Sequence, residues 1–435
     1  MRAKQFRILF VALLLCVSTF GQHQEKPQWG YQFGSQTKAT TSFIAVQTPS
    51  SWKYGSYGFD FDTAEAVHMM DKGMIATSSV YFSVSVAPGN YLVSICFGSE
   101  DTPSVNSVKA ESKRLLVNQL ELQKETHKVL EFVVHVQSKK IDSTEEVRLK
   151  PRDVNALNWD AKLSLEFLSG TAIESLKFIK LDSIPTLFLA GDSTVADQDL
   201  SPWASWGQFI TQYFNGSIGV ANYAASGASL PSFKGRKRWD KILSLIKKGD
   251  YVMIEFGHND EKIKGKGAGP WASYTALLKA YVTAARSKGG IPILITPLQR
   301  RAFDDNGKLK PTHGDYPDAV RAVAKSLSVP LIDLTKMSSV LYESWGAKDS
   351  KYGFVHYPKN SFPGQDMELK DNTHFNDFGA NEIALCVVQA IKDLDIDLKG
   401  HLKSIKEYNP KDPNRIEDWT LPMSPRFEVK KPEGN

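Results

Sequence analysis

Hydrophobic and polar residues follow two different periods in the two halves of the chain. From about residue 29 to residue 181 the apolar positions recur at every second residue, as in the run Val80, Phe82, Val84 and Val86. Strict alternation turns one apolar face of each strand inward. Turn-rich pieces separate these runs and no helical stripe lies between them, so residues 27–183 are predicted to form an antiparallel β-sandwich.

The second half, residues 184–396, alternates short apolar strands with helical stripes. Stripes with apolar residues at i, i+3, i+4 and i+7 begin at Trp239 and Tyr274, and a last helix runs from about Ile383 to Ile391. This order predicts an α/β domain whose parallel sheet is covered on both faces and binds ligands at the carboxyl ends of its strands. The predicted strands are 186–190, 218–221, 251–256, 293–296 and 330–334.

The two ends of the chain differ from these domains. Residues 1–21 combine three basic residues, a short apolar core and a zone of small residues, which predicts a cleavable signal peptide and a periplasmic or extracellular protein. No later stretch is apolar enough to span a bilayer, so no membrane span is expected in the mature chain. Residues 397–435 are rich in proline and predict an extended tail, of which Trp419 and Phe427 pack back onto a domain.

Composition narrows the class of protein. The 435 residues are 42% hydrophobic and 23% charged, as in ordinary soluble domains and unlike disordered, collagen-like or coiled-coil chains. Without the three basic residues of the leader, the net charge falls from +5 to +2, which argues against a nucleic-acid partner. Cys96 and Cys386 fall in different predicted domains, so no disulfide bridge between them is expected.

Candidate catalytic residues follow the first three strands of the α/β half. Ser193 comes directly after the first strand, where a nucleophile would face the ligand edge of the sheet. Gly227 and Asn259 follow the next two strands and offer N–H donors for the oxyanion that forms when a hydroxyl attacks an ester. In Asp371-Asn-Thr-His374, a spacing of three lets the carboxylate reach the imidazole that such a nucleophile needs.

Four segments in this order resemble the sequence blocks of SGNH (GDSL-type) hydrolases, and more narrowly those of rhamnogalacturonan acetylesterases. They are Gly191-Asp-Ser-Thr194, Asn222 to Ser229, Gly257-His-Asn-Asp260 and Asp371 to His374. The resemblance implies a flavodoxin-like three-layer α/β/α fold that needs no cofactor and no metal. The N-terminal half is similar to the galactose-binding-like modules that accompany such esterases.

The resemblance also implies a role for each site residue. Ser193 would be the nucleophile, and its backbone N–H would donate to the oxyanion together with the N–H of Gly227 and the side-chain amide of Asn259. His374 would be the general base, oriented by Asp371. Family members often have arginine after the second-block glycine, whereas this chain has Ala228, which puts substrate contacts near that loop in question.

Several other residues invite more than one interpretation. His258 is interpreted as structural support, pointing away from Asn259. His313 is open between a place lining the cleft and a place in a surface loop. Trp52, Tyr54 and Tyr57 could stack on sugar rings, although packing is slightly favoured.

Together these features predict a serine esterase that removes O-acetyl groups from pectic polysaccharide, particularly rhamnogalacturonan. Its partner would then be acetylated plant cell-wall polysaccharide or its oligosaccharides. A first alternative keeps the chemistry but acts on xylan, another glycan, a lipid or a thioester; the polar loops at 299–301 and 359–361 fit a lipid poorly. A second alternative is a carbohydrate-binding protein on a hydrolase scaffold.

Overall fold

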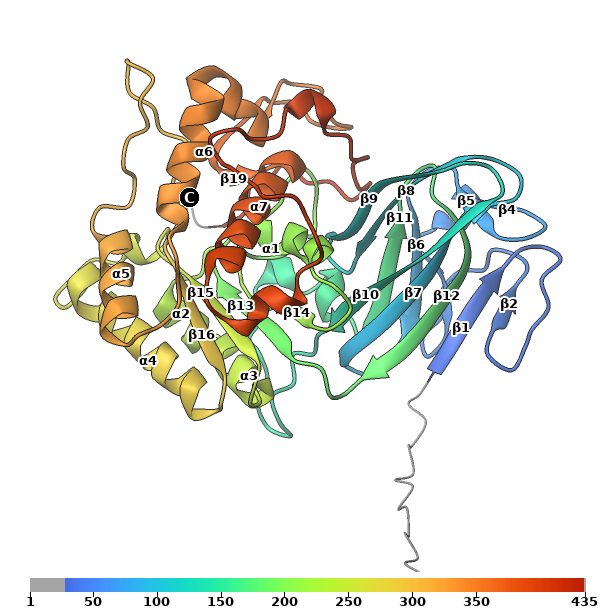
Figure 1. The fold of residues 1–435 in the computed structure, drawn as a ribbon, viewed down its shortest axis with the longest axis horizontal. Helices are drawn as coiled ribbons and strands as arrows, with labels where there is room; N and C mark the ends of the chain where they lie inside the picture. The colour runs from blue at the N-terminus through green and yellow to red at the C-terminus, as the bar shows by residue number, and fades with distance from the viewer. Residues whose placement is uncertain (1–27, 434–435) are drawn as a thin grey trace, which may run out of the picture.

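Two sheet-based regions lie side by side in the computed structural model, which describes residues 28–433 (Figure 1). Strands β1 to β12 form the region on the right of the view. The parallel sheet and its helices form the region on the left. The predicted signal peptide lies outside the described residues.

The first region is a β-sandwich of two mainly antiparallel sheets, with strand orders β10-β7-β12-β1-β2 and β3-β6-β11-β8-β9. The apolar positions of the period-two pattern, among them Phe82, Val93 and Leu165, meet in one buried core between the sheets. The strands are β1 (Gln28–Phe33), β2 (Ile44–Val46), β3 (Tyr57–Asp60), β4 (Val67–Met69), β5 (Met74–Ala76), β6 (Val80–Ser85), β7 (Gly89–Ser99), β8 (Ser104–Ala110), β9 (Arg114–Leu122), β10 (Thr126–Val136), β11 (Lys162–Phe167) and β12 (Ala172–Leu181).

The polar face of the second sheet is buried as well. In β11 every residue is buried, including Glu166, which accepts a hydrogen bond from Ser424 of the C-terminal tail at 2.7 Å. On β8, the side chain of Lys109 reaches Asp377 and Ser424. Lys109 and Glu166 therefore connect this face of the sandwich to α7 and the tail, because their buried polar groups find partners there.

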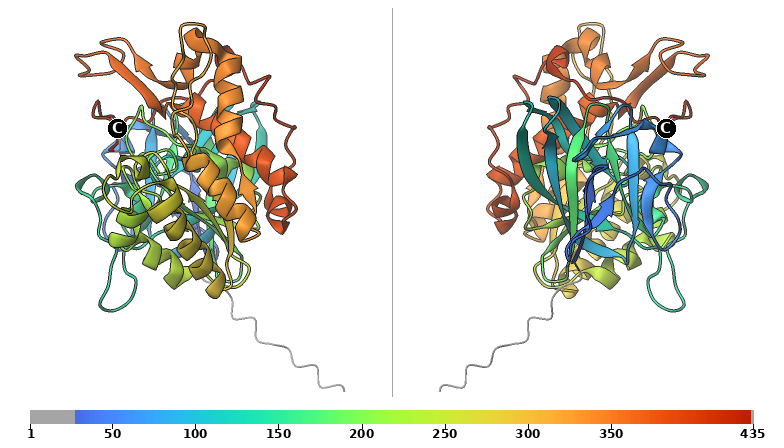
Figure 2. Two further views of the ribbon diagram at one scale, coloured as in Figure 1. Left: turned by 90° about the vertical axis from the view of Figure 1, so that its left-hand side faces the viewer. Right: turned by 90° about the vertical axis from the view of Figure 1, so that its right-hand side faces the viewer.

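The second region is a three-layer α/β/α domain, as the sequence predicts. Its parallel sheet has the order β14-β13-β15-β16-β17, and an antiparallel pair, β18 and β19, follows it in the chain. Residues of α1, α6 and α7 share a core with one face of the sheet, and residues of α2 to α5 share a core with the other (Figure 2). The strands are β13 (Thr186–Gly191), β14 (Gly219–Asn222), β15 (Tyr251–Glu255), β16 (Ile291–Ile295), β17 (Leu331–Ile332), β18 (Phe354–Tyr357) and β19 (Leu369–Phe375), and the helices are α1 (Trp206–Phe209), α2 (Leu230–Gly235), α3 (Arg238–Leu245), α4 (Thr275–Ser287), α5 (Tyr316–Ser326), α6 (Leu334–Asp349) and α7 (Asp377–Asp393).

One strand is shorter than the sequence predicts. The predicted strand 330–334 is reduced to β17, because Asp333 accepts the backbone N–H of Lys336 and caps α6. The helix therefore begins at Leu334, where the strand was expected to end.

The proline-rich tail packs against both regions. Trp419 contacts Phe209 and Phe378, and Phe427 contacts Phe362, which confirms that these two aromatic residues pack back. The backbone of Ser201 pairs with tail residues on either side of Phe427. The last described residues then lie beside the ligand edge of the parallel sheet.

Two further expectations concern cysteines and membranes. Cys96 and Cys386 are both free thiols, and Cys386 is fully buried. No helix within residues 28–433 has the length and apolar character needed to cross a membrane.

Candidate active site

Ser193 lies in a tight turn directly after β13. The Oδ1 atom of Asp192 accepts two hydrogen bonds from Thr194, from its N–H at 3.0 Å and its hydroxyl at 2.9 Å, and so folds the turn around the serine. Gly191 lets the turn approach β15, since a Cβ there would lie 2.9 Å from the carbonyl oxygen of Glu255. The hydroxyl of Ser193 is thereby held at the carboxyl edge of the sheet.

The imidazole of His374 bridges Ser193 and Asp371. Its Nε2 lies 2.9 Å from the Oγ of Ser193, and its Nδ1 lies 2.9 Å from the Oδ2 of Asp371. An ionised carboxylate can only accept, so the hydrogen lies on Nδ1 and Nε2 is the nitrogen that faces the serine hydroxyl as an acceptor. Ser193 lies far from Asp371 and His374 in the sequence, and the structure brings all three together.

Asp371 is held as a carboxylate. Its Oδ1 accepts the backbone N–H groups of Thr373 and His374 at 2.7 and 2.9 Å. Burial would raise the pKa of Asp371, but the hydrogen bond and charge of His374, with these two N–H groups, outweigh burial and lower the pKa below its usual range. Asp371 and His374 come together at an irregularity in the pairing of β19 with β18, between Lys370 and Phe375, and not in a helical turn.

The three predicted oxyanion donors lie on adjacent strand ends. Within residues 28–433, neither the N–H of Ser193 nor that of Gly227 donates a hydrogen bond to a protein acceptor. The Nδ2 of Asn259 gives one hydrogen to the carbonyl of Ala228 at 3.0 Å, which fixes the amide and leaves its second hydrogen for another acceptor. Ala228 itself is buried.

A lysine from the other region lies at this loop. The Nζ of Lys150, which precedes the short helical turn Pro151–Asp153, donates to the carbonyl of Ser226 at 2.5 Å. The same Nζ lies 2.6 Å from the carboxylate of Glu433 in the tail. Sequence reasoning missed both residues, because no pattern in the sandwich half points to the ligand edge of another domain.

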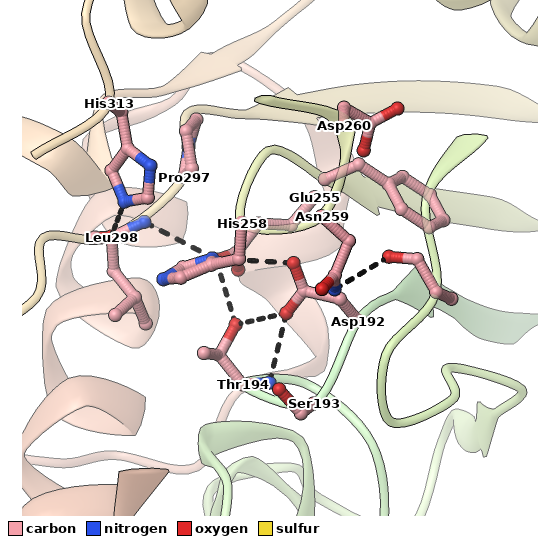
Figure 3. Close-up of polar contacts among 12 residues, drawn as sticks. Asp192, Ser193, Thr194, Glu255, His258, Asn259, Asp260, Pro297, Leu298 and His313 are labelled. Carbon is pink, nitrogen blue, oxygen red and sulfur yellow. Dashed lines mark hydrogen bonds and ion pairs between the residues drawn. The ribbon is translucent and has the colours of Figure 1, made fainter. Parts of the chain in front are cut away.

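A second carboxylate–imidazole pair is buried behind the serine (Figure 3). The Nδ1 of His258 lies 3.3 Å from the Oδ2 of Asp192, and both side chains are essentially inaccessible. Burial lowers the pKa of His258 to about 4, so the ring is neutral at pH 7. For Asp192, burial would raise the pKa, but His258 and the hydrogen bonds from Thr194 lower it.

Glu255, at the end of β15, completes this buried group. It accepts the indole N–H of Trp206 at 2.8 Å. It also lies 3.3 Å from the hydroxyl of Thr194 (Figure 3). Burial, reinforced by the nearby charge of Asp192, raises the pKa of Glu255 to about 8. The carboxyl group is therefore mainly protonated at neutral pH.

His313 lies in neither of the expected places. Its Nε2 is 2.7 Å from the carbonyl oxygen of Leu298 and its Nδ1 is 2.9 Å from Glu261, and the ring is buried against His258. Both the cleft and the surface-loop interpretations are wrong, because the ring satisfies both nitrogens inside the domain. The interpretation of His258 as a support residue agrees with its burial.

The three aromatic residues considered for sugar stacking differ in their surroundings. Tyr57 packs on Tyr31 and Phe82 beside the sandwich core, whereas Tyr54 is 93% exposed. The ammonium nitrogen of Lys162 lies over the ring of Trp52, 4.4 Å from the ring centroid.

Two hollows adjoin the site. One, of about 420 Å³, lies between the segment around Arg152, the loop at 196–200 and the tail. The other, of about 430 Å³, lies next to Asp371 and is lined by four basic side chains, Lys262, Arg300, Lys370 and Lys431. In the described part of the chain, no group of three or more His, Cys, Asp or Glu side chains is placed to hold a metal ion.

A serine, a histidine and an aspartate joined in series at the carboxyl edge of an α/β/α sheet are typical of SGNH-type ester hydrolases. Residues 189–381 match the family model described as GDSL-like lipase/acylhydrolase. The chain belongs to this family and is a carboxylic ester hydrolase.

Individual relatives show where the similarity lies. The chain is 44% identical over 220 residues to the rhamnogalacturonan acetylesterase RhgT of Bacillus subtilis, covering 50% of this chain and 94% of that protein. It is 34% identical to the probable rhamnogalacturonan acetylesterase YesY of the same organism, covering 49% and 94%. A crystal structure of Bacillus subtilis YxiM matches with 23% identity and a TM-score of 0.44, over 84% of this chain and 98% of that one.

Proposed function

We propose that this protein is a serine esterase that removes O-acetyl groups from rhamnogalacturonan. The observation that carries the proposal is the unbroken series of hydrogen bonds from Ser193 through His374 to Asp371. This is the arrangement that a hydroxyl needs to become a nucleophile, because the imidazole takes its proton and the carboxylate stabilises the imidazolium.

In the first half of the reaction, the Oγ of Ser193 attacks the acetyl carbonyl carbon and the Nε2 of His374 takes the hydroxyl proton. The tetrahedral intermediate collapses when the imidazolium returns that proton to the sugar oxygen, which leaves as an alcohol. In the second half, water attacks the acetyl-serine, His374 takes a proton from the water and then gives it to the Oγ of Ser193. Acetate leaves, and the serine hydroxyl is restored.

The oxyanion of each intermediate would lie among three donors, the N–H groups of Ser193 and Gly227 and the side-chain amide of Asn259. Two observations support this role of the donors. The two backbone N–H groups have no protein acceptor among residues 28–433, and the amide has a fixed orientation. Removal of one such donor typically costs about 2.7–4 kcal/mol of transition-state stabilisation.

The substrate class is supported by two observations. Two relatives are named as a rhamnogalacturonan acetylesterase and a probable one. The hollow beside Asp371 is lined by basic side chains, of which Arg300 also pairs with Glu261 and Lys370 with Glu368. A basic rim suits a rhamnogalacturonan backbone because its galacturonate residues carry carboxylates.

The basic and apolar leader over residues 1–21 supports export to the compartment where such polymers occur.

The test is acetate release from acetylated rhamnogalacturonan and acetylated xylan, measured side by side with Ser193→Ala as the matched control. Release from the pectic polymer that disappears in the variant is the expected result. Release from xylan alone would overturn the proposed substrate but would leave the proposed serine-esterase mechanism in place. No release from either polymer by the folded wild type would favour the sugar-binding alternative.

A further inference from the structure

The segment between β10 and β11 leaves the sandwich and lies against the loop that follows β14. Arg238 of α3 joins the two: it donates to the carbonyl oxygens of Tyr223 and Ala224 at 3.1 Å, and its other terminal nitrogen lies 2.5 Å from Asp153. The guanidinium group is buried, so these contacts hold the two segments in one fixed relation. We call residues 137–161 the linking segment.

Lys150 brings the linking segment to the proposed oxyanion hole. Its side chain is 10% exposed, and its ammonium group donates to the carbonyl of Ser226. That carbonyl and the N–H of Gly227 belong to the same peptide group. A Cβ added to Gly227 would lie 3.0 Å from the Nζ, so the cation is in contact with this peptide.

The backbone conformation at Gly227 makes the orientation of the 226–227 peptide depend on a hydrogen bond from outside the loop. Gly227 has a φ of 71°, in the left-handed region that glycine enters as readily as the right-handed one. A peptide bordered by such a residue can rotate, and a rotation would turn the N–H of Gly227 away from the nucleophile. A hydrogen bond to the carbonyl resists that rotation.

The charge of the partner matters as well as its position. A cation bound to a carbonyl oxygen draws electron density along the peptide and makes its N–H a stronger donor. Glu433 supplies the counter-charge: burial would raise its pKa, but its hydrogen bond and charge interaction with Lys150 lower it, so it remains a carboxylate. The Ser226 side chain is held separately, by the amide of Gln198 at 3.1 Å.

We propose that Lys150 is a positioning residue of the oxyanion hole, contributed by the β-sandwich to a site otherwise built from the α/β domain. It acts through the 226–227 peptide, which it orients and polarises. The inference rests on the proposed serine-esterase function, because it requires the N–H of Gly227 to bind the oxyanion. The effect belongs to the transition state, where negative charge develops on the ester oxygen.

The first experiment compares kcat and KM for p-nitrophenyl acetate in full-length wild type, Lys150→Met, Lys150→Arg and Glu433→Gln. Lys72→Met is the matched control, since Lys72 forms an exposed ion pair with Glu100 at 2.9 Å. We expect Lys150→Met to lower kcat about tenfold or more, less than the loss of a whole donor, with KM changed less than about threefold. Lys150→Arg should recover most of this loss, and Lys72→Met should stay within about twofold of wild type. Glu433→Gln should lose less than Lys150→Met, because the hydrogen bond from Lys150 to the carbonyl of Ser226 remains.

A second measurement follows the transition state more directly. Phenylboronic acid forms an anionic tetrahedral adduct on a serine Oγ, so its inhibition constant should rise in Lys150→Met by a factor similar to the fall in kcat/KM. Should Lys150→Met fail to fold, Lys150→Gln takes its place, because its shorter, neutral side chain cannot reach the carbonyl.

Three outcomes would overturn the inference. One is an unchanged kcat in a folded Lys150→Met or Lys150→Gln protein. Another is an equal loss in Glu433→Gln, which would mean that Lys150 serves the tail and not the peptide. The third is a loss confined to KM. Activity that persists in Ser193→Ala would instead overturn the proposed function, so the two failures are distinguishable.

Discussion

Two carboxylate–imidazole pairs flank the turn that carries Ser193. In one, Asp371 lies 2.9 Å from His374, whose other nitrogen faces the serine hydroxyl at the same distance. In the other, Asp192 lies 3.3 Å from His258, whose ring is enclosed by the protein and packs on His313. The residue types are the same, but only one imidazole has a hydroxyl to take a proton from.

On the proposed mechanism, a histidine beside a carboxylate acts as a general base only where its other nitrogen reaches a hydroxyl, as in His374 and not in His258. Burial lowers the pKa of His258 to about 4 and leaves it without a reacting partner. The Oδ1 of Asp192 accepts a hydrogen bond from Thr194 in the turn, whereas the Oδ1 of Asp371 accepts a hydrogen bond from the backbone of β19. Each carboxylate therefore fixes the segment of chain around it. The two pairs differ in what the imidazole contacts on its other side, which is the hydroxyl of Ser193 for His374 and the ring of His313 for His258.

The largest expected effect removes the proton transfer of the first pair. Ser193→Ala and His374→Ala should each lower kcat by about 10⁴–10⁶-fold, because neither nucleophile nor base acts alone. Hydrolysis of p-nitrophenyl acetate measures the loss, and a thermal midpoint close to that of wild type shows that the fold is retained. A residual rate near wild type in either variant would exclude this pair from catalysis.

Asp371→Asn comes next, with an expected fall in kcat of about 10⁴-fold. The amide can no longer hold the hydrogen on Nδ1 of His374, so the ring loses the tautomer that accepts the serine proton. The effect should remain smaller than that of His374→Ala in the same assay. Asp371→Asn activity below that of His374→Ala would mean that the carboxylate does more than orient the ring.

Asn259→Ala tests the proposed oxyanion donor separately from its neighbour His258, which pairs with Asp192. Loss of one oxyanion donor should lower kcat by about 10²–10³-fold with little change in KM. Steady-state kinetics on p-nitrophenyl acetate give both constants. A change in KM alone would assign Asn259 to substrate binding and leave the oxyanion hole to the backbone.

His258→Gln should have the reverse profile. Since the ring touches no reacting atom, kcat should stay within a few-fold of wild type, while the free energy of unfolding falls by about 1–3 kcal/mol because Asp192 loses its buried partner. Urea denaturation measures the stability, with Lys72→Met as a surface control. A loss of kcat as large as that of Asn259→Ala would contradict the division between the pairs.

The smallest effect concerns Glu255, the buried carboxyl group close to Asp192 of the second pair. Between its ordinary pKa of 4.5 and the folded value of about 8, Glu255 holds a proton in the native state that the unfolded chain has released. Stability contributed by this group therefore falls as pH rises through that window. Glu255→Gln, which keeps the shape of the protonated acid, should lose less stability than wild type between pH 5 and pH 8 in urea denaturation. Parallel pH profiles would show that Glu255 is ionised throughout.

Sequence patterns predicted the fold class and the contact between Asp371 and His374 because both rest on local signals, whereas the resemblance to SGNH hydrolases implied that Ser193 joins them. Period two and helical stripes report which residues face a core, and polar residues at parallel strand ends share one edge. Helices α5 and α6 are not among the predicted helices: the buried stripe of α5 includes small alanines, and α6 is interrupted at Gly346. The place of His313 depends on Leu298 and Glu261, which no local pattern connects to it.

The amino-acid sequence by itself therefore determined two units of different hydrophobic period and the candidate residues for ester chemistry. The tertiary structure decided how the units share their surfaces. It buried the polar face of β11 under the tail and brought Lys150 of one unit to the 226–227 peptide of the other. The physical reason is that periodicity records which residues lie inward, whereas a buried polar group is satisfied by whichever partner the folded chain places beside it.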